Sequence, residues 1–233
     1  MKGYDKYQTL MAIWADEYMR PFVNPEKRNK VPERSKAFLT KLFFGFMEIS
    51  GTVEALKLSE VLISIAPPRS NKIKRDDYLR YHINAYLQEV YILKERLNSY
   101  ATHLKRVYLK TEHNPHFERN AEPLFYLVKE GLANWIHTRG HHVHAYRYSD
   151  PALERLSAIT LISNYQYDFV DAAAFEYKIV QRTWKNRIAT NNQQTTKLLD
   201  LYFDRMYEAV TKNGKVVVPP SAQLTNANRN SPT

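Results

Sequence analysis

The sequence contains no cysteine among its 233 residues. Disulfide frameworks, cysteine-based zinc fingers and thiol catalysis are therefore excluded. The N-terminus lacks the charged start and apolar run of a signal peptide, and no run of about 18 apolar residues is present that could cross a membrane. We therefore expect a soluble cytoplasmic protein without a membrane segment.

Glycine is also scarce, with 6 residues, and periodic apolar patterns occupy much of the chain. Both features favour helices over sheets. The predicted fold class is an all-α helical bundle with one long central helix. The length suits one domain over residues 1–212, with its core at about 75–190 and the N-terminal helices at 4–66 as an addition. Residues 213–233 are polar and contain proline, and we expect a flexible tail there.

The net charge is +10, and the isoelectric point is about 9.5. A basic balance of this size attracts polyanions in a salt-dependent way, and it suits a nucleic-acid partner. The alternative is a basic surface that only contacts solvent. Basic residues gather in segments 26–34 and 69–75, and again between Lys178 and Arg187.

Residues 75–110 carry the strongest periodic signal. Apolar residues recur there at alternating spacings of four and three, from Leu79 to Val107, without Gly or Pro inside. This predicts the long central helix, with a continuous apolar seam. A polar row follows the seam at intervals of seven: His82, Glu89, Arg96 and His103. These side chains either pair with neighbouring helices or line a functional cleft, with Glu89 the first candidate for the cleft.

The remaining pattern predicts further helices separated by breaks. Helical spacing covers residues 4–20, 33–50, 52–66, 123–139, 151–188 and 198–212. The second and third of these are two helices or one helix interrupted near Gly51. A loop is expected at 111–122, followed by a helix that opens at Pro123, and a break is expected at Asn191–Thr196. Asp150 and Pro151 predict a helix start, and Asn213-Gly214 predicts a helix cap.

The stretch from Trp135 to Tyr146 concentrates reactive side chains. It contains one arginine, Arg139, the phenol of Tyr146 and four histidines: His137, His141, His142 and His144. A guanidinium stays charged and matches phosphate oxygens, whereas an imidazole transfers protons near neutral pH. Together they suit RNA cleavage, in which a base activates the 2′-hydroxyl and a cation stabilises the phosphate. This reaction requires no metal or other cofactor.

The pattern Arg-x4-His-x-Tyr, formed by Arg139, His144 and Tyr146 in a helical chain, resembles the HEPN superfamily. The resemblance is to its ribonuclease toxins of toxin–antitoxin and phage-defence systems. It implies a HEPN-like fold and a homodimer in which Arg139 and His144 cleave RNA. It also implies a cognate antitoxin of the nucleotidyltransferase type that modifies Tyr146. Tyr146, His141, Glu89 and Arg147 are the candidates for binding or supporting the substrate.

Three interpretations of this stretch remain open. On one continuous helix, Arg139 and His144 would point about 140° apart, so shared catalysis needs a bend or an end near Gly140. A continuous helix would instead align His137, His141 and His144 as a zinc site. Single histidines can also simply pack and form hydrogen bonds. Because Gly140 replaces the family's usual Asn, a HEPN-like module that binds nucleic acid, nucleotide or protein without cleavage is the competing function.

Overall fold

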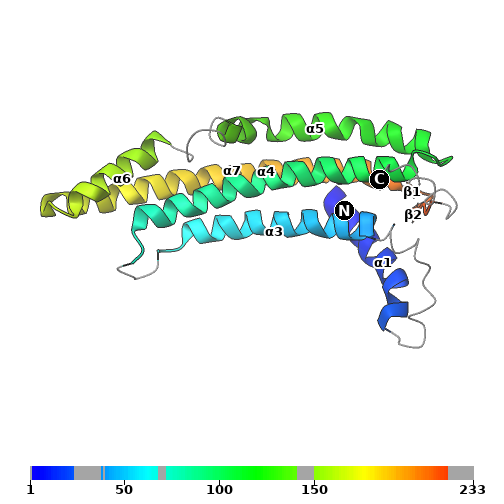
Figure 1. Cartoon of the computed structure of the whole chain (residues 1–233), viewed down its shortest axis with the longest axis horizontal. Coiled ribbons are helices and arrows are strands. Elements are labelled where there is room, and N and C mark those ends of the chain that lie inside the picture. The colour runs from blue at the N-terminus through cyan, green and yellow to red at the C-terminus, as the bar shows by residue number, and fades with distance from the viewer. Residues whose placement is uncertain (1, 24–37, 39, 68–71, 141–149, 220–233) are drawn as a thin grey trace, which may run out of the picture. The chain divides into compact units, whose positions relative to one another are not determined.

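The computed structural model describes residues 2–23, 38, 40–67, 72–140 and 150–219, and these residues are almost entirely helical. The helices are α1 (Gly3–Val23), α3 (Gly45–Ser64), α4 (Arg75–Tyr108), α5 (Asn114–Gly140), α6 (Pro151–Ser163) and α7 (Val170–Val210). A π-helical turn, η2 (Thr40–Phe44), precedes α3, and a short 3₁₀ helix, η3 (Tyr167–Phe169), precedes α7 (Figure 1). The expected all-α helical bundle is confirmed.

The chain divides into two compact units. Unit 1 comprises Met1–Gly51, Lys94–Gly131 and Thr196–Thr233, and unit 2 comprises Thr52–Leu93 and Leu132–Thr195. The helices α3, α4, α5 and α7 each contribute residues to both units. Each unit has its own buried apolar side chains, which we describe separately.

Unit 1 is built around an aromatic cluster. Tyr7 packs on Phe203 with ring centroids 4.9 Å apart, and on Phe46 at 5.4 Å. Phe46 and Phe203 also meet edge to face at 5.4 Å. Aromatic rings bury large areas, and tilted contacts of this kind add to the packing energy. The cluster therefore joins α1, α3 and α7.

Unit 2 buries apolar residues from five described helices. They include Leu56 and Ile63 of α3, Leu79, Ile83 and Val90 of α4, Leu132 of α5, Leu153 and Leu156 of α6, and Val180, Trp184 and Ile188 of α7. The α4 residues belong to the seam expected from the sequence, and α4 spans Arg75–Tyr108 as a single helix. The predicted long helix is therefore confirmed.

The expected loop at 111–122 is wrong, because α5 already begins at Asn114. Pro115 directly follows Asn114, in the first turn, where its missing N–H removes no helical hydrogen bond. Phe117 is fully buried and stacks on Tyr108, with centroids 4.9 Å apart. Pro123 lies inside α5 on its exposed side, where water can satisfy the carbonyl that loses its partner.

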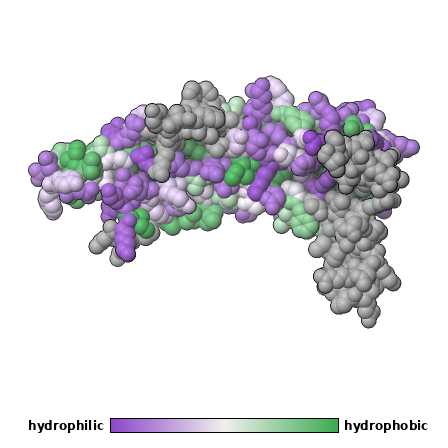
Figure 2. Space-filling model, viewed as in Figure 1, coloured by the Kyte–Doolittle hydropathy of each residue, from purple (hydrophilic) through white to green (hydrophobic). Residues whose placement is uncertain are grey.

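The expected helix over 151–188 is also wrong, since it is divided after Ser163. Asn164, Tyr165 and Gln166 separate α6 from η3, and α7 starts at Val170. Several residues assigned to its apolar face are therefore exposed, including Tyr165 at 84%. Figure 2 shows hydrophobic residues, in green, over the turn between α6 and α7.

The expected break at Asn191–Thr196 does not occur, because α7 runs without interruption from Val170 to Val210. The expected cap at Asn213-Gly214 is instead the two-residue turn of a hairpin between β1 (Thr211–Lys212) and β2 (Lys215–Val216). Asn213 and Gly214 both have positive φ, 54° and 74°, which suits this turn. Residues 213–219 are thus part of the fold, and Tyr108 donates a hydrogen bond to the carbonyl of Val217.

Two glycines give opposite predictions for stability. A Cβ on Gly3 would lie 2.0 Å from the carbonyl oxygen of Asp200, whereas a Cβ on Gly51 would meet nothing within 4 Å. We expect Gly3→Ala to destabilise the fold by about 1–3 kcal/mol through this collision. Gly51 lies inside α3, so Gly51→Ala should stabilise the fold by about 0.5–1 kcal/mol. Denaturant unfolding of both variants measures this; equal signs would contradict the packing described.

Candidate functional site

The helix α5 leads into the reactive stretch. Its buried residues follow helical spacing: Phe117, Leu124 and Val128 in unit 1, then Leu132 in unit 2. Near its end, the ring of Trp135 meets Tyr86 of α4 edge to face, with centroids 5.6 Å apart. This contact fixes the last turns of α5 against α4. The backbone of Arg139 is helical, and the described part of α5 ends at Gly140.

The other sequence-predicted residues of this stretch follow Gly140. His141, His144, Tyr146 and Arg147 lie within 141–149, outside the described residues, as does the side chain of Arg139. The proposed convergence of Arg139 and His144 therefore stays a prediction. The zinc alternative at His137, His141 and His144 falls outside in the same way, and within the described part of the chain no group of His, Asp or Glu could hold a metal.

The chain after the reactive stretch is anchored at Asp150. As the sequence predicts, Asp150 caps α6, with its Oδ1 accepting a hydrogen bond from the Ala152 amide at 2.8 Å. Its Oδ2 lies 3.0 Å from Nη1 of Arg187 on α7. The guanidinium of Arg187 in turn lies over Trp184, 5.1 Å from the ring centroid. Within unit 2, Asp150 thus caps α6 and pairs with α7.

A buried polar network lies beside Trp135, and the sequence analysis missed it. The hydroxyl of Tyr86 donates to Oδ1 of Asn192 at 3.0 Å and accepts from the amide of Asn191. The amide of Asn192 also reaches Oε2 of Glu60 at 2.7 Å. Burial raises the pKa of Tyr86 well above its ordinary value, so its hydroxyl stays protonated. The polar run at 191–196, expected as a break, instead points two amides into unit 2.

The polar row on α4 divides into different environments. Glu89 is half-buried in unit 2, within one turn of Tyr86. Arg96 forms an ion pair with Glu48 at 2.6 Å and donates to the Glu48 carbonyl, so it joins α4 to α3 in unit 1. His82 packs edge to face on Tyr78, and burial lowers its pKa, whereas His103 is exposed. Arg96 therefore pairs with a neighbouring helix, as one of the two alternatives predicted. A role for Glu89 in a functional cleft stays a prediction.

Two histidines of the expected loop have a structural role. Ring nitrogens of His113 and His116 lie 2.8 Å and 2.7 Å from the carbonyl oxygens of Ala209 and Glu208. A carbonyl only accepts hydrogen bonds, so the ring N–H groups donate. These carbonyls belong to the last turn of α7, which has no helical partners for them. The pair therefore caps α7 in unit 1.

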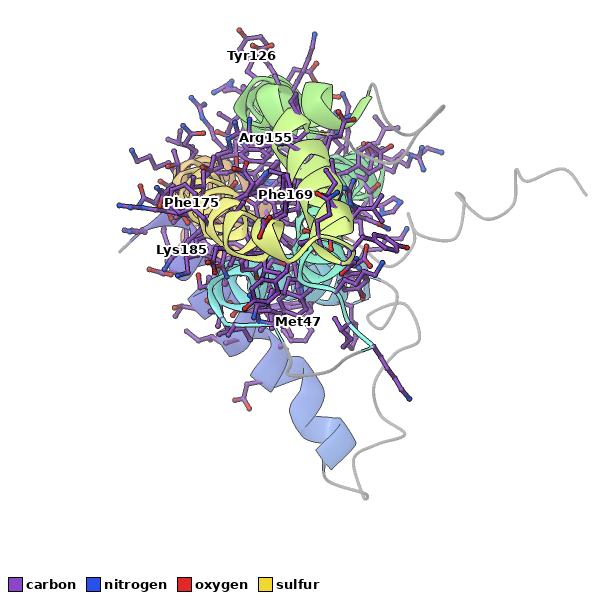
Figure 3. The ribbon with its side chains drawn as sticks, turned by 90° about the vertical axis from the view of Figure 1, so that its left-hand side faces the viewer. Met47, Tyr126, Arg155, Phe169, Phe175 and Lys185 are labelled. Atoms are coloured by element: carbon purple, nitrogen blue, oxygen red, sulfur yellow. The ribbon has the colours of Figure 1, made fainter. Side chains whose placement is uncertain are left out.

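An exposed stripe of cations lies on the unit 2 part of α7. Lys178, Arg182 and Lys185 are exposed, at helical spacings of four and three, and none forms an ion pair with a described residue. Phe175 and Lys185 lie on the same outer side of α7 (Figure 3). In contrast, Arg155 is paired with Glu176 at 2.6 Å. Unpaired cations at this spacing offer a surface to a polyanion.

No protein-family model matches this sequence, and it shows no similarity to curated proteins or to solved structures.

Proposed function

We propose that this protein is a metal-independent endoribonuclease in which Arg139 and His144 act together. The observation that carries the proposal is the order of residues where α5 ends. Arg139 occupies the last turn of α5, and His144 and Tyr146 follow within the nine residues that lead to the anchored Asp150. A cation, a proton-transfer group and a phenol thus fall in one short stretch of sequence between the end of α5 and the start of α6.

In the proposed reaction, His144 removes the proton from a ribose 2′-hydroxyl. The resulting oxygen attacks the adjacent phosphorus, and the bond from phosphorus to the 5′-oxygen of the next nucleotide breaks. A proton then reaches that leaving oxygen, and the products are a 2′,3′-cyclic phosphate and a 5′-hydroxyl. Arg139 stabilises the negative charge on the non-bridging oxygens. His141, Arg147 and Glu89 would hold the substrate around this centre.

Charge supports this assignment. The net charge of +10 attracts RNA, and the exposed Lys178, Arg182 and Lys185 extend positive charge along α7. The same stripe favours a second candidate function: a helical module that binds nucleic acid or nucleotide without cleaving it. The two functions share the binding surface and differ only in whether Arg139 and His144 converge.

The resemblance to HEPN toxins adds a proposed assembly state, cellular role and partner. It implies a homodimer, a role in a toxin–antitoxin or phage-defence system, and a nucleotidyltransferase-type antitoxin that silences the protein by modifying Tyr146. The described helices support only the all-α architecture that such a protein needs. Measuring the molecular mass in solution of the protein purified without a partner distinguishes a homodimer from a monomer.

The experiment that tests the proposed function is incubation of the full-length protein with unstructured RNA in the presence of a chelator. Cleavage without divalent cations supports the ribonuclease and rejects the zinc alternative. Binding of the same RNA without any cleavage would reject the ribonuclease and favour the binding module. Loss of activity in chelator that zinc restores would instead assign the histidines to a metal.

A further inference from the structure

A pocket in unit 2 lies where α3 ends, α4 begins and α7 passes. Its volume is about 430 Å³. It is lined by Ser64, Ala66, Pro67, Arg75, Ala174, Tyr177, Lys178 and Gln181. Pockets for small molecules span roughly 300–1,000 Å³, so this one is large enough for a nucleotide.

A separate groove of about 570 Å³ lies in unit 1 between α5 and α7. That groove is lined by both acidic and basic residues, including Asp204, Arg205 and Glu208, so its charge favours no particular ligand. The pocket of unit 2 differs because its charges have one sign.

Two cations and no carboxylate line the unit 2 pocket. Arg75 and Lys178 are both exposed, and neither forms an ion pair with a described residue. Asp76 and Glu176 are next to lining residues in the sequence, but neither lines the pocket. Oδ2 of Asp76 accepts a hydrogen bond from Ser157 at 2.9 Å, and Glu176 is paired with Arg155. The pocket therefore has a net positive charge, which suits an anion.

The third polar group is the hydroxyl of Tyr177. The side chain is only 6% exposed, and its hydroxyl is buried without a hydrogen-bond partner. Buried hydroxyls nearly always have a partner, so an unpaired one requires an explanation. Burial raises the pKa of Tyr177, Tyr78 adds to that shift, and the positive charge of Arg75 opposes it. An anionic oxygen is the partner that this donor lacks.

The helix ends around the pocket leave its charge to the side chains. Asp76 and Asp77 lie in the first turn of α4, which starts at Arg75, and their carboxylates compensate the positive end of the helix dipole. The negative end of the α3 dipole is compensated by the side-chain amide of Gln181. The amide of Gln181 donates to the carbonyls of Ile63 at 2.9 Å and Ile65 at 3.3 Å.

We infer that this pocket binds the phosphate group of a nucleotide through Arg75, Tyr177 and Lys178. Arginine and lysine supply charge-assisted hydrogen bonds, and the Tyr177 hydroxyl donates a third. The phosphate belongs either to a free nucleotide or to the backbone of a single strand. Arg182 and Lys185 continue the face of Lys178 along α7, and Phe175, 66% exposed, precedes it by one turn. These residues offer further phosphate contacts and a stacking surface to a strand.

The test is titration calorimetry of the full-length protein with inorganic phosphate and with uridine 5′-monophosphate. We expect both to bind, and Arg75→Gln, Lys178→Gln and Tyr177→Phe each to weaken binding about tenfold or more. Lys129→Gln is the matched control, because Lys129 is exposed on α5 and does not line the pocket. Tyr177→Phe removes only an unpaired hydroxyl, so this variant should remain folded by circular dichroism.

Absence of binding by the unchanged protein, or unchanged affinity in any of the three variants, would overturn the assignment. A second titration with a short single strand identifies the source of the phosphate. If Arg182→Gln and Lys185→Gln weaken binding of the strand but not of the mononucleotide, the pocket holds a backbone phosphate; if they weaken neither, it holds a free nucleotide. The inference does not rest on the proposed cleavage, because none of the residues that line the pocket belongs to the reactive stretch from Trp135 to Tyr146.

Discussion

Replacing His144 with alanine is expected to lower the rate of RNA cleavage by a factor of about 10²–10⁴. This is the usual contribution of a positioned general acid or base, and a methyl group cannot transfer a proton. Helical circular dichroism of the variant separates a loss of catalysis from a loss of folding. Cleavage of a labelled RNA, followed over time in chelator, measures the effect.

Arg139 should respond differently from His144. Arg139→Ala removes the charge that stabilises the reacting phosphate, so cleavage should fall by about 10²–10³. Arg139→Lys keeps the charge but loses the planar fork that matches two phosphate oxygens, so it should restore only part of the rate. The pH profile separates the roles, since only the His144 variant should lose the dependence of the rate on pH near neutrality.

Matched controls exist on the described helices. His103 is an exposed histidine of α4, and Arg119 is an exposed arginine of α5. Alanine at either position makes the same chemical change away from the reactive stretch, and cleavage should persist. If the His103 and His144 variants cleave RNA at the same rate as the unchanged protein, the assignment of His144 is wrong.

Unit 1 is expected to unfold cooperatively as the pH rises above 10. Burial raises the pKa of four tyrosines in this unit well above the ordinary value of 10: Tyr7, Tyr100, Tyr108 and Tyr202. A raised pKa in the folded state means that unfolding releases protons once the pH exceeds the unfolded value. Stability is therefore fully present below pH 10 and is lost as the pH rises towards the folded pKa values.

Three of these buried phenols also donate hydrogen bonds. The hydroxyl of Tyr100 donates to the carbonyl of Leu42 at 2.9 Å, so Tyr7, 2.6 Å away, donates to Tyr100. Tyr202 donates to the carbonyl of Leu97 at 2.7 Å. A phenolate could not donate, and it would leave a buried charge beside a carbonyl oxygen. Ionisation therefore requires that the packing around these rings opens.

The size of the effect follows from linkage. Each tyrosine lowers the free energy of unfolding by about 1.4 kcal/mol per pH unit above its unfolded pKa, so the four together lower it by roughly 5.6 kcal/mol per unit. Whole domains are stable by only about 5–15 kcal/mol, so unfolding should be complete within a few pH units. Phenolate absorbance and helical circular dichroism should change together. Phenolates that all appear near pH 10 while the helices persist would contradict the burial of these rings.

The sequence predicted α4 well because its signal is redundant. Apolar residues repeat from Leu79 to Val107 without an interrupting Gly or Pro, and the buried positions of α4 follow that seam. The cap at Asp150 was equally predictable, because an acid before Pro151 satisfies the first free amides of α6. Both signals are local, and no tertiary contact opposes them.

Other boundaries depended on contacts that the pattern does not reveal. Pro123 indicated a helix start, yet α5 begins nine residues earlier, where Phe117 packs on Tyr108. The amides of Asn191 and Asn192 indicated a break, yet they bind Tyr86 and Glu60 across unit 2. The turn after Ser163 contains neither Gly nor Pro, so nothing in the local sequence marked it. In each case tertiary packing outweighed local preference.

The candidate sites divide in the same way. The Arg139–His144–Tyr146 pattern was visible in the sequence because its residues are adjacent in the chain. The pocket of Arg75, Tyr177 and Lys178 was not visible in the sequence, because Arg75 is about a hundred positions from the other two residues. Tyr177 also falls on the apolar face of a helical pattern, where a tyrosine is ordinary. Only the fold brings these residues together, and only burial identifies the unpaired hydroxyl.

The most direct test of the central claim uses an RNA in which one nucleotide lacks its 2′-hydroxyl. The account predicts cleavage of the unmodified RNA in chelator, with 2′,3′-cyclic phosphate and 5′-hydroxyl ends, and no cleavage after the 2′-deoxy nucleotide. The neighbouring positions should still be cut. Cleavage after the 2′-deoxy nucleotide, or products that carry 5′-phosphate ends, would show that the nucleophile is not the substrate's own hydroxyl and would contradict the account.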